Sequence, residues 1–422
     1  MSQLPALLGG PKTFGQPWPR PVTTGARELE AARTVLESGV LSDFVGSPHP
    51  RFGGGHEVLA LEAAWAEAFN TRHAVSVSSA TAGLHAALVA GGVGHGDEVI
   101  VPSQTMSATA TAVILAGATP VFVDQDAATC CLDPVATRAA IGSRTVAIIA
   151  VNLFGGPASL TRLRELADER DLLLIEDNAQ GAGGRQAGRS LGTIGDLGVF
   201  SLNFHKTIQC GEGGVVVTDD DRLARRLTLV RNHGENVIEA YGWSDDADVA
   251  GHNYRLTEIQ AAIARVQLNR LEELLVPRLA TARALDERLG RFPALRTARV
   301  GPGDRHVYYV YPLWLDEDRA GMGRDLFVAA LVAEGCPVVG GYVRPLYHLP
   351  LHRRLAERGL SLVRGPAAAP TICPNAERAF RSELLYTTLV QYPFDERTCD
   401  GFAAAVEKIL DHAGALTAWA AG

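Results

Sequence analysis

Residues 73–103 read HAVSVSSATAGLHAALVAGGVGHGDEVIVPS, and this stretch shows the pattern from which we predict the fold class. An apolar run, HAVSVSS, is followed by a helical pattern, TAGLHAALVAGG, and then by a second apolar run, DEVIVPS. The alternation continues to residue 181 through the apolar runs TPVFVDQD, TVAIIAVN and LLLIEDNAQG. Strands that alternate with helices of this length predict an α/β fold with a mainly parallel sheet. Because the apolar runs are continuous, we expect strands buried on both faces.

A chain of 422 residues is too long for one simple core, and the pattern changes after a long helical segment. That segment, YRLTEIQAAIARVQLNRLEELL, predicts a helix from about Tyr254 to Pro277. Beyond it, HVYYVYPLWL, GRDLFVAALVAEG, PVVGGYV and CDGFAAAVEKILDHAG indicate a smaller α+β domain. We therefore expect an N-terminal segment (1–24), a large domain (25–277) and a small C-terminal domain (278–422).

Composition excludes several classes of function. The net charge is −8 and no dense Lys/Arg stripe occurs, which argues against a nucleic-acid partner. The N-terminus, MSQLPALLGGPKTFGQPWPRP, lacks the pattern of a signal peptide, and no apolar run is long enough to span a bilayer. The six cysteines form no C-x-x-C pair and are expected to be reduced. These features favour a cytoplasmic protein without a membrane partner.

Three motifs are weighed and set aside. The glycines of GGVGHGD do not fit the dinucleotide pattern G-x-G-x-x-G. GRSLG matches the nucleophile elbow of hydrolases, but no apolar strand precedes Ser190, which we interpret as a loop serine. In HLPLH, Pro350 separates His348 from His352 and no H-E-x-x-H glutamate is present, so we predict no metal.

Ligands of open parallel sheets bind at the carboxyl ends of the strands. Three stretches of the sequence lie at such ends, and together they favour one kind of binding site. Ser79 can cap a helix whose first-turn amides would bind a phosphate, although a well-capped helix alone would look the same. Glu176 and Asp177 end an apolar strand, where one solvated carboxylate and one cap are the usual arrangement. Lys206 lies in SLNFHKTIQCGEGG, after the apolar DLGVFSLNF. A phosphate cradle, a carboxylate for a ring nitrogen and a lysine for a Schiff base are the parts of a pyridoxal phosphate site.

The chain resembles the DegT/DnrJ/EryC1/StrS family of pyridoxal phosphate-dependent aminotransferases. The resemblance runs from about Gly39 to the C-terminus and includes SSATAGLHAAL, GDEVIVPSQTMSATATAV, IEDNAQGAG, GDLGVFSLNFHKTIQCGEGGVVVT, RNHG and NYRLTEIQAAIARVQL. It implies the fold-type I architecture. It also implies a small-molecule amino donor, a keto acceptor and a homodimer with shared sites.

The resemblance assigns a role to each matched residue. Lys206 corresponds to the lysine that forms the Schiff base and moves protons, and Asp177 to the carboxylate that faces the pyridinium nitrogen. Gln180 corresponds to the residue near the phenolic oxygen of the cofactor. Phosphate binding falls to Ser201, to the loop Ser79–Ala80–Thr81 and, from the neighbouring subunit, to Asn253.

Three positions depart from the family pattern. Ala80 stands where glycine is common, which keeps the amide but narrows the backbone angles. Met106 stands where an aromatic ring usually stacks on the cofactor, and a thioether can still pack on a ring face. His205 directly precedes the lysine; it could tune proton transfer or be a satisfied neighbouring histidine, and we favour the second interpretation.

CGEGG and ICPNAERAFRSELL look closest to the branch that acts on cyclitols in antibiotic pathways, with nucleotide-sugar aminotransferases next. We therefore expect an amino group to pass from glutamine or glutamate to a keto-cyclitol or keto-sugar, with ping-pong kinetics. One alternative is dehydration and aromatisation of an amino-cyclic substrate, as in aminohydroxybenzoate synthases. A second is a non-catalytic partner or sensor that binds the cofactor, and a hydrolase using Ser190 is a distant third.

Overall fold

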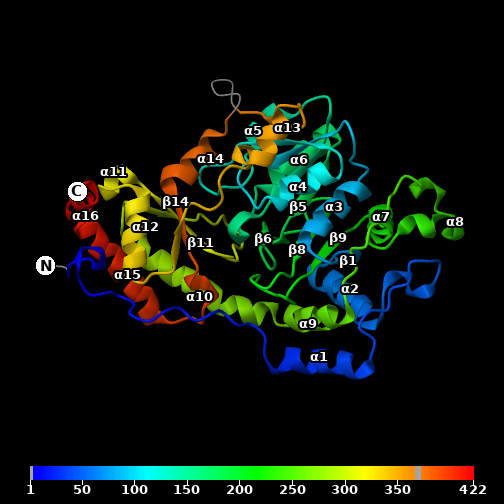
Figure 1. The fold of residues 1–422 in the computed structure, drawn as a ribbon, viewed down its shortest axis with the longest axis horizontal. Coiled ribbons are helices and arrows are strands. Elements are labelled where there is room, and N and C mark those ends of the chain that lie inside the picture. The colour runs from blue at the N-terminus through cyan, green and yellow to red at the C-terminus, as the bar shows by residue number, and fades with distance from the viewer. Residues whose placement is uncertain (1–2, 366–371) are drawn as a thin grey trace.

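A computed structural model describes residues 3–365 and 372–422, and its centre is an eight-stranded sheet (Figure 1). The strand order is β1-β9-β8-β5-β4-β2-β3-β13. Pairing from β8 through to β13 is parallel, whereas β9 is antiparallel to both of its neighbours. The strands are β1 (His73–Val77), β2 (Glu98–Pro102), β3 (Thr119–Val123), β4 (Thr145–Val151), β5 (Leu173–Asp177), β8 (Leu197–Ser201), β9 (Gly214–Thr218) and β13 (Leu362–Val363).

The predicted alternation of strands and helices is confirmed from β1 to β5. The crossover helices are α3 (Ala80–Ala90), α4 (Ala108–Leu115), α5 (Pro134–Ala140) and α6 (Leu160–Arg170). Every residue of β2, β8 and β9 is buried, as the continuous apolar runs predicted. The α/β class with a mainly parallel sheet is therefore confirmed.

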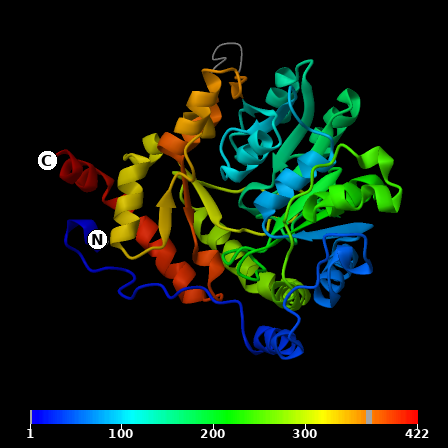
Figure 2. The same ribbon diagram turned by 45° about the vertical axis from the view of Figure 1, so that its right-hand side comes forward.

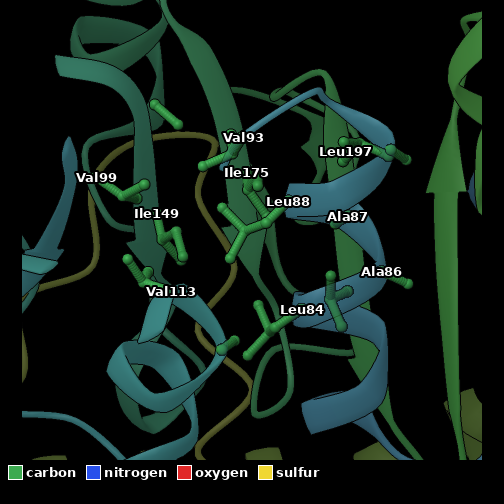
Figure 3. Close-up of a cluster of buried hydrophobic side chains, with 14 of the residues drawn as sticks. Leu84, Ala86, Ala87, Leu88, Val93, Val99, Val113, Ile149, Ile175 and Leu197 are labelled. Carbon is green, nitrogen blue, oxygen red and sulfur yellow. The ribbon is translucent and has the colours of Figure 1, made fainter. Parts of the chain in front are cut away.

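Helix α3 is held tightly against this sheet. Its residues Leu84 and Leu88 lie in one buried cluster with Ile149 and Ile175 of the central strands (Figure 3). A Cβ atom at Gly83 would lie 2.9 Å from a methyl group of Val199, so only glycine permits this approach. The packing fixes the N-terminus of α3 at the carboxyl edge of the sheet.

A second, four-stranded antiparallel sheet lies beside the first, with the order β10-β11-β14-β12. The chain segment before α1 packs on its core through Leu7, Leu8, Phe14 and Trp18, and both termini lie near it (Figures 1 and 2). The elements are β10 (Leu295–Thr297), β11 (Tyr311–Leu315), β12 (Val338–Gly340), β14 (Leu384–Thr387), α12 (Arg324–Ala333), α15 (Glu396–Asp411) and α16 (Ala413–Ala421).

The long helix predicted from Tyr254 to Pro277 is wrong in its boundaries. Two helices, α9 (Glu258–Asn269) and α10 (Leu271–Leu289), meet at Arg270, whose backbone is not helical. Thr257 delays the start, because its side chain accepts a hydrogen bond from the Gln260 amide as an N-cap. Helix α10 continues through Pro277, because its later turns bury apolar side chains such as Leu285.

The remaining helices and strands lie on the periphery. Helix α1 lies alongside α9 (Figures 1 and 2). None of the helices in the described ranges combines the length and apolar character needed to cross a bilayer. These elements are α1 (Ala26–Ser38), α2 (His56–Phe69), α7 (Asp221–Arg231), α8 (Ile238–Tyr241), α11 (Glu317–Ala320), α13 (Pro350–Ala356), α14 (Pro374–Arg378), β6 (Arg185–Gln186) and β7 (Arg189–Ser190).

Candidate active site

A cavity of about 210 Å³ opens at the carboxyl edge of the large sheet. All of the residues predicted to bind a cofactor line it, with the exception of Asn253. They come from the ends of different strands and from the start of α3, so the fold brings together positions more than 120 residues apart. The predicted lining residues are Ser79, Ala80, Thr81, Met106, Asp177, Gln180, Ser201 and Lys206.

The N-terminus of α3 forms one wall of the cavity. Ser79 is its N-cap, as predicted, and its hydroxyl accepts a hydrogen bond from the Ala82 amide at 3.1 Å. Strand β9 passes close behind this turn, because a Cβ atom at Gly214 would lie only 2.7 Å from the Ala80 nitrogen. First-turn amides carry the positive end of the helix dipole, so this wall suits an anion such as a phosphate.

Asp177 ends β5 and presents its carboxylate to the cavity from a buried position. It accepts hydrogen bonds from the Thr109 hydroxyl at 2.8 Å and from the Ala179 amide at 3.2 Å. Burial raises the pKa of this carboxyl, while these donors and the charge of Lys206 act to lower it. The site therefore holds a carboxylate that favours a cationic partner.

Glu176 points to the other face of the sheet, as alternation along a strand requires. Its carboxylate accepts hydrogen bonds from the amides of Gly192, Ile194 and Gly195, and from Asn152. It is completely buried, so the expectation of one solvated carboxylate at this strand end is wrong. The loop that follows β7 closes over Glu176 and supplies the donors, which no local pattern signals.

Lys206 lies within the turn that joins β8 to β9, five residues after β8 ends at Ser201. Its backbone amide donates to the Asn203 carbonyl at 2.9 Å, and its Nζ lies 4.5 Å from the ring centre of Tyr309. Burial lowers the pKa of the Lys206 amine to about 8, and the Asp177 carboxylate opposes this shift. An amine with a pKa near 8 becomes largely neutral just above physiological pH, and the neutral form is the one that acts as a nucleophile.

Gln180 connects the cavity to two aromatic residues. Its Oε1 accepts a hydrogen bond from the Phe154 amide at 2.7 Å, and its Nε2 donates to the Tyr342 hydroxyl at 2.9 Å. Tyr342 lines the cavity, whereas Arg344 of the same loop is exposed and lies outside the lining. Tyr342 belongs to the loop YVRPLYH, and the sequence alone did not place it at the site.

The sequence analysis missed two residues that contact the predicted catalytic pair: Thr109, behind the cavity wall, and Tyr309, in the cavity lining. Thr109 sits on α4 and looks like an ordinary helix residue in the sequence, yet it donates to Asp177. Tyr309 comes from a segment about a hundred residues after Lys206, so only the fold brings the two together. The only signal for Thr109 in the sequence was a threonine within a helix of small, apolar residues at the edge of the sheet.

The other residues predicted for the site, Met106, Ser201 and Asn253, differ in their exposure to solvent and in their contacts. Met106 is 56% exposed at the rim of the cavity, and Ser201 is buried beside the amide of Asn203. The exposed Asn253 pairs through its backbone with Asn232. The carbonyl of the next residue, Tyr254, accepts a hydrogen bond from the Ser78 amide, so this segment runs past the start of α3.

The residues of the motifs that the sequence analysis set aside lie in ordinary structural surroundings. Ser190 lies in the short strand β7 rather than in a loop, and it is not among the residues that line the cavity. His348 contacts Glu377, and buried His352 packs edge-on against Phe122. Within the described ranges, no group of three or more His, Cys, Asp or Glu side chains is placed to hold a metal ion. The six cysteines are buried and unpaired.

Comparison with known proteins identifies the class to which this fold and site belong. The model of the DegT/DnrJ/EryC1/StrS aminotransferase family matches residues 28–376, and the chain belongs to this family. The architecture is that of the fold-type I pyridoxal phosphate aminotransferases, and the family's enzymes depend on that cofactor.

Three solved structures illustrate the likeness. DesV of S. venezuelae, solved in complex with a ketimine intermediate, is 32% identical with a TM-score of 0.76, over 90% of this chain and 94% of that one. DesI, solved in the presence of its TDP-sugar product, is 30% identical with a TM-score of 0.81, over 99% of both chains. 3-Amino-5-hydroxybenzoic acid synthase is 27% identical with a TM-score of 0.76, over 94% of this chain and 99% of that one.

Proposed function

We propose that this protein uses pyridoxal phosphate to transfer an amino group from glutamine or glutamate to a keto-cyclitol or keto-sugar, within an antibiotic-type biosynthetic pathway. The observation that carries the proposal is the meeting of Lys206 and Asp177 in one cavity that also contains the N-terminus of α3. Family membership supports the transamination. The neighbours DesI and 3-amino-5-hydroxybenzoic acid synthase support a sugar or a carbocycle as the acceptor.

The residues present fit the cofactor. The α3 amides and the Ser201 hydroxyl would hold the phosphate, and Gly214 leaves the first turn of α3 unobstructed. The buried Asp177 carboxylate would pair with the protonated ring nitrogen. Gln180 would lie near the phenolic oxygen, and Met106 would pack on the ring face.

When bound, pyridoxal phosphate supplies an electron-accepting ring and a carbonyl that carries the amino group. The chain's own contribution is to bind, orient and move protons. Lys206 provides the amine that takes and returns the substrate proton, and its lowered pKa allows it to act as a base near neutral pH. Thr109 orients Asp177, and its hydrogen bond opposes the rise in pKa that burial causes in this carboxyl.

We also propose a homodimer in which Asn253 reaches the cavity of the neighbouring subunit. Asn253 is exposed and, within the described chain, lies outside the lining of its own cavity, which supports this arrangement. The domain division 25–277 and 278–422 remains our proposal, with α10 spanning the boundary. A cytoplasmic location is proposed with it.

A second candidate is dehydration and aromatisation of an amino-cyclic substrate. The structural likeness to 3-amino-5-hydroxybenzoic acid synthase favours it, and Lys206 would serve both reactions. The two reactions differ in their products, because only the second one releases water. Mass spectrometry of the product from a keto-cyclitol therefore separates them.

The decisive experiment is an ultraviolet–visible spectrum of the purified protein before and after addition of glutamine, and then of glutamate. The transaminase proposal expects a cofactor band that one donor removes and that is missing or unresponsive in Lys206→Ala. A wild-type band that responds to neither donor would instead support a non-catalytic partner or sensor. No band after addition of pyridoxal phosphate would overturn the proposal.

A further inference from the structure

The ring of Tyr309 lies against the amine of Lys206, the group proposed to react. Nζ lies 4.5 Å from the ring centre, within the range of a cation–π contact. The ring also lines the cavity, and its centre lies 5.9 Å from that of His205. An amine on a flexible four-carbon stem gains a defined position from such a surface.

The backbone of residues 306–309 is fixed at both ends. The amides of Val307 and Tyr309 donate to the carbonyls of Gly155 and Phe154 at 2.9 and 2.8 Å. Tyr308 has a φ of +47°, which is uncommon for a residue with a side chain. This turn sends the Tyr308 ring to stack on Tyr311 in the second core, while Tyr309 enters the cavity.

Arg278 of α10 supports this segment from the other side. Its Nη1 donates to the carbonyls of Tyr308 and Tyr309 at 2.8 and 3.1 Å, and Gln391 donates to the Tyr309 carbonyl at 3.1 Å. The guanidinium is buried, and the partners found for it in the described chain are carbonyls instead of carboxylates. A buried cation with no opposite charge is costly, so the guanidinium depends on these carbonyls and in turn holds the Tyr308–Tyr309 backbone in place.

Phe154 connects the same segment to Gln180. Its carbonyl accepts from the Tyr309 amide, and its own amide donates to Oε1 of Gln180. Phe154 therefore supports both the ring of Tyr309, which contacts Lys206, and the side chain of Gln180, which is proposed to bind the cofactor. Displacement of the 306–309 segment would disturb both groups together.

We propose that Tyr309 is a catalytic residue whose ring face positions the Lys206 amine, and that Arg278 is the positioning residue that holds Tyr309 in place. The inference rests on the proposed function, because Lys206 is the reacting group in both. The ring, not the hydroxyl, makes the contact. Phenylalanine at position 309 should therefore preserve the contact with the Lys206 amine, whereas leucine should not.

The test uses the full-length protein with bound pyridoxal phosphate and four variants: Tyr309→Phe, Tyr309→Leu, Arg278→Met and the exposed α10 control Arg283→Met. Two quantities are measured, kcat for transamination and the visible circular dichroism of the bound cofactor, which reports its orientation. Arg283→Met should match the wild type, whereas Tyr309→Phe keeps the ring and should therefore lose less kcat than Tyr309→Leu and retain the wild-type dichroism spectrum. Tyr309→Leu and Arg278→Met should lose about tenfold in kcat and share an altered dichroism spectrum.

The double variant Tyr309→Leu/Arg278→Met should be no worse than either single variant, because Arg278 acts through Tyr309. If Arg278→Met does not fold, Gln391→Leu removes the other donor to the Tyr309 carbonyl and should shift the dichroism in the same direction. If Tyr309→Leu keeps the wild-type kcat and dichroism spectrum, this inference is overturned and the proposed function is not affected. A wild-type protein that takes up no pyridoxal phosphate would overturn the proposed function and this inference together.

Discussion

The hydroxyl of Thr109 donates a hydrogen bond of 2.8 Å to Oδ2 of Asp177, and both residues are buried at the carboxyl edge of the large sheet. Helix α4 thereby supplies a donor to a carboxylate at the end of β5. A buried carboxylate stays ionised only when donors and cations offset its desolvation. Thr109 is thus part of what would allow Asp177 to take the role proposed for it opposite a cationic ring nitrogen.

Thr109→Val should move the acidic limb of the pH profile of kcat/KM upward. Burial already raises the pKa of Asp177, and loss of a donor raises it further, so the ionised form is lost at a higher pH. A hydrogen bond to a charged group contributes about 1.5–3 kcal/mol, which corresponds to a shift of about one pH unit or more. Thr111→Val on the same helix is the control, and an unshifted limb in Thr109→Val would contradict this role.

The Lys206 amine should capture pyridoxal phosphate with a pH midpoint near 8. Only the neutral amine is nucleophilic, and burial lowers its pKa to about 8, so the capture rate rises with pH and levels off above that value. Stopped-flow absorbance of the apoprotein measures this rate. Asp177→Asn should move the midpoint lower, because the Asp177 charge raises the pKa of the amine. A midpoint near 10.5, the ordinary pKa of a lysine, would show that the amine is solvated.

Gly214→Ala should damage the phosphate-binding turn, whereas Gly211→Ala should not. The added Cβ at position 214 would lie 2.7 Å from the Ala80 nitrogen and 2.8 Å from the Ser79 carbonyl carbon, so the start of α3 must shift. We expect a loss of about 1–3 kcal/mol in unfolding free energy and a clearly weaker affinity for pyridoxal phosphate.

Gly211 provides the matched control for this steric effect. Its φ is +91°, but no atom lies within 4 Å of the position of an added Cβ. Gly211→Ala should therefore lose about 1 kcal/mol through backbone strain and keep its cofactor affinity. Urea unfolding and cofactor titration measure the two quantities, and equal affinities in both variants would remove the proposed importance of the close approach.

Glu334→Gln should destabilise the second core and the N-terminal segment. The Glu334 carboxylate accepts from the Lys408 amine at 2.9 Å, from the Ala6 amide at 2.7 Å and from the Thr13 hydroxyl at 2.8 Å. Removal of its charge leaves Lys408 buried without a carboxylate, which typically costs about 3 kcal/mol in unfolding free energy. The double variant Glu334→Gln/Lys408→Met should recover part of this loss in urea unfolding.

The pH dependence of stability gives an independent check on Glu334. Burial acts to raise the pKa of its carboxyl, but the donors outweigh burial and the pKa lies below 4.5, the ordinary value for glutamate. The contribution is therefore fully present above that value and is lost as the pH falls through the lowered pKa. Wild-type and Glu334→Gln proteins should converge in stability at acidic pH, and a constant difference would argue against the ion pair.

Much of the large sheet could be predicted from local pattern. The apolar runs that end at Val77, Pro102, Val123 and Val151 all became buried strands, because an extended run of apolar residues between helical patterns has few other ways to leave water. Ser79 was recognised as an N-cap for a local reason as well, since its hydroxyl satisfies an amide three residues away.

The errors occurred where distant contacts decide the outcome. Helix α10 runs through Pro277 because the buried side chains that follow it offset the missing backbone hydrogen bond. Glu176 is buried because a loop sixteen to nineteen residues later supplies three amides. Neither effect has a signature in the residues nearby.

The sequence by itself determined the fold class and the family, and it selected a lysine and a carboxylate that the structure places in one cavity, because these depend on periodicity and on short, ordered motifs. Only the tertiary structure decided what surrounds them. Tyr309, Tyr342 and Arg278 reach the cavity or support it from segments that fold around the second sheet. Their role depends on distances between residues far apart in the chain, and those distances are set by packing of the two cores rather than by any local pattern.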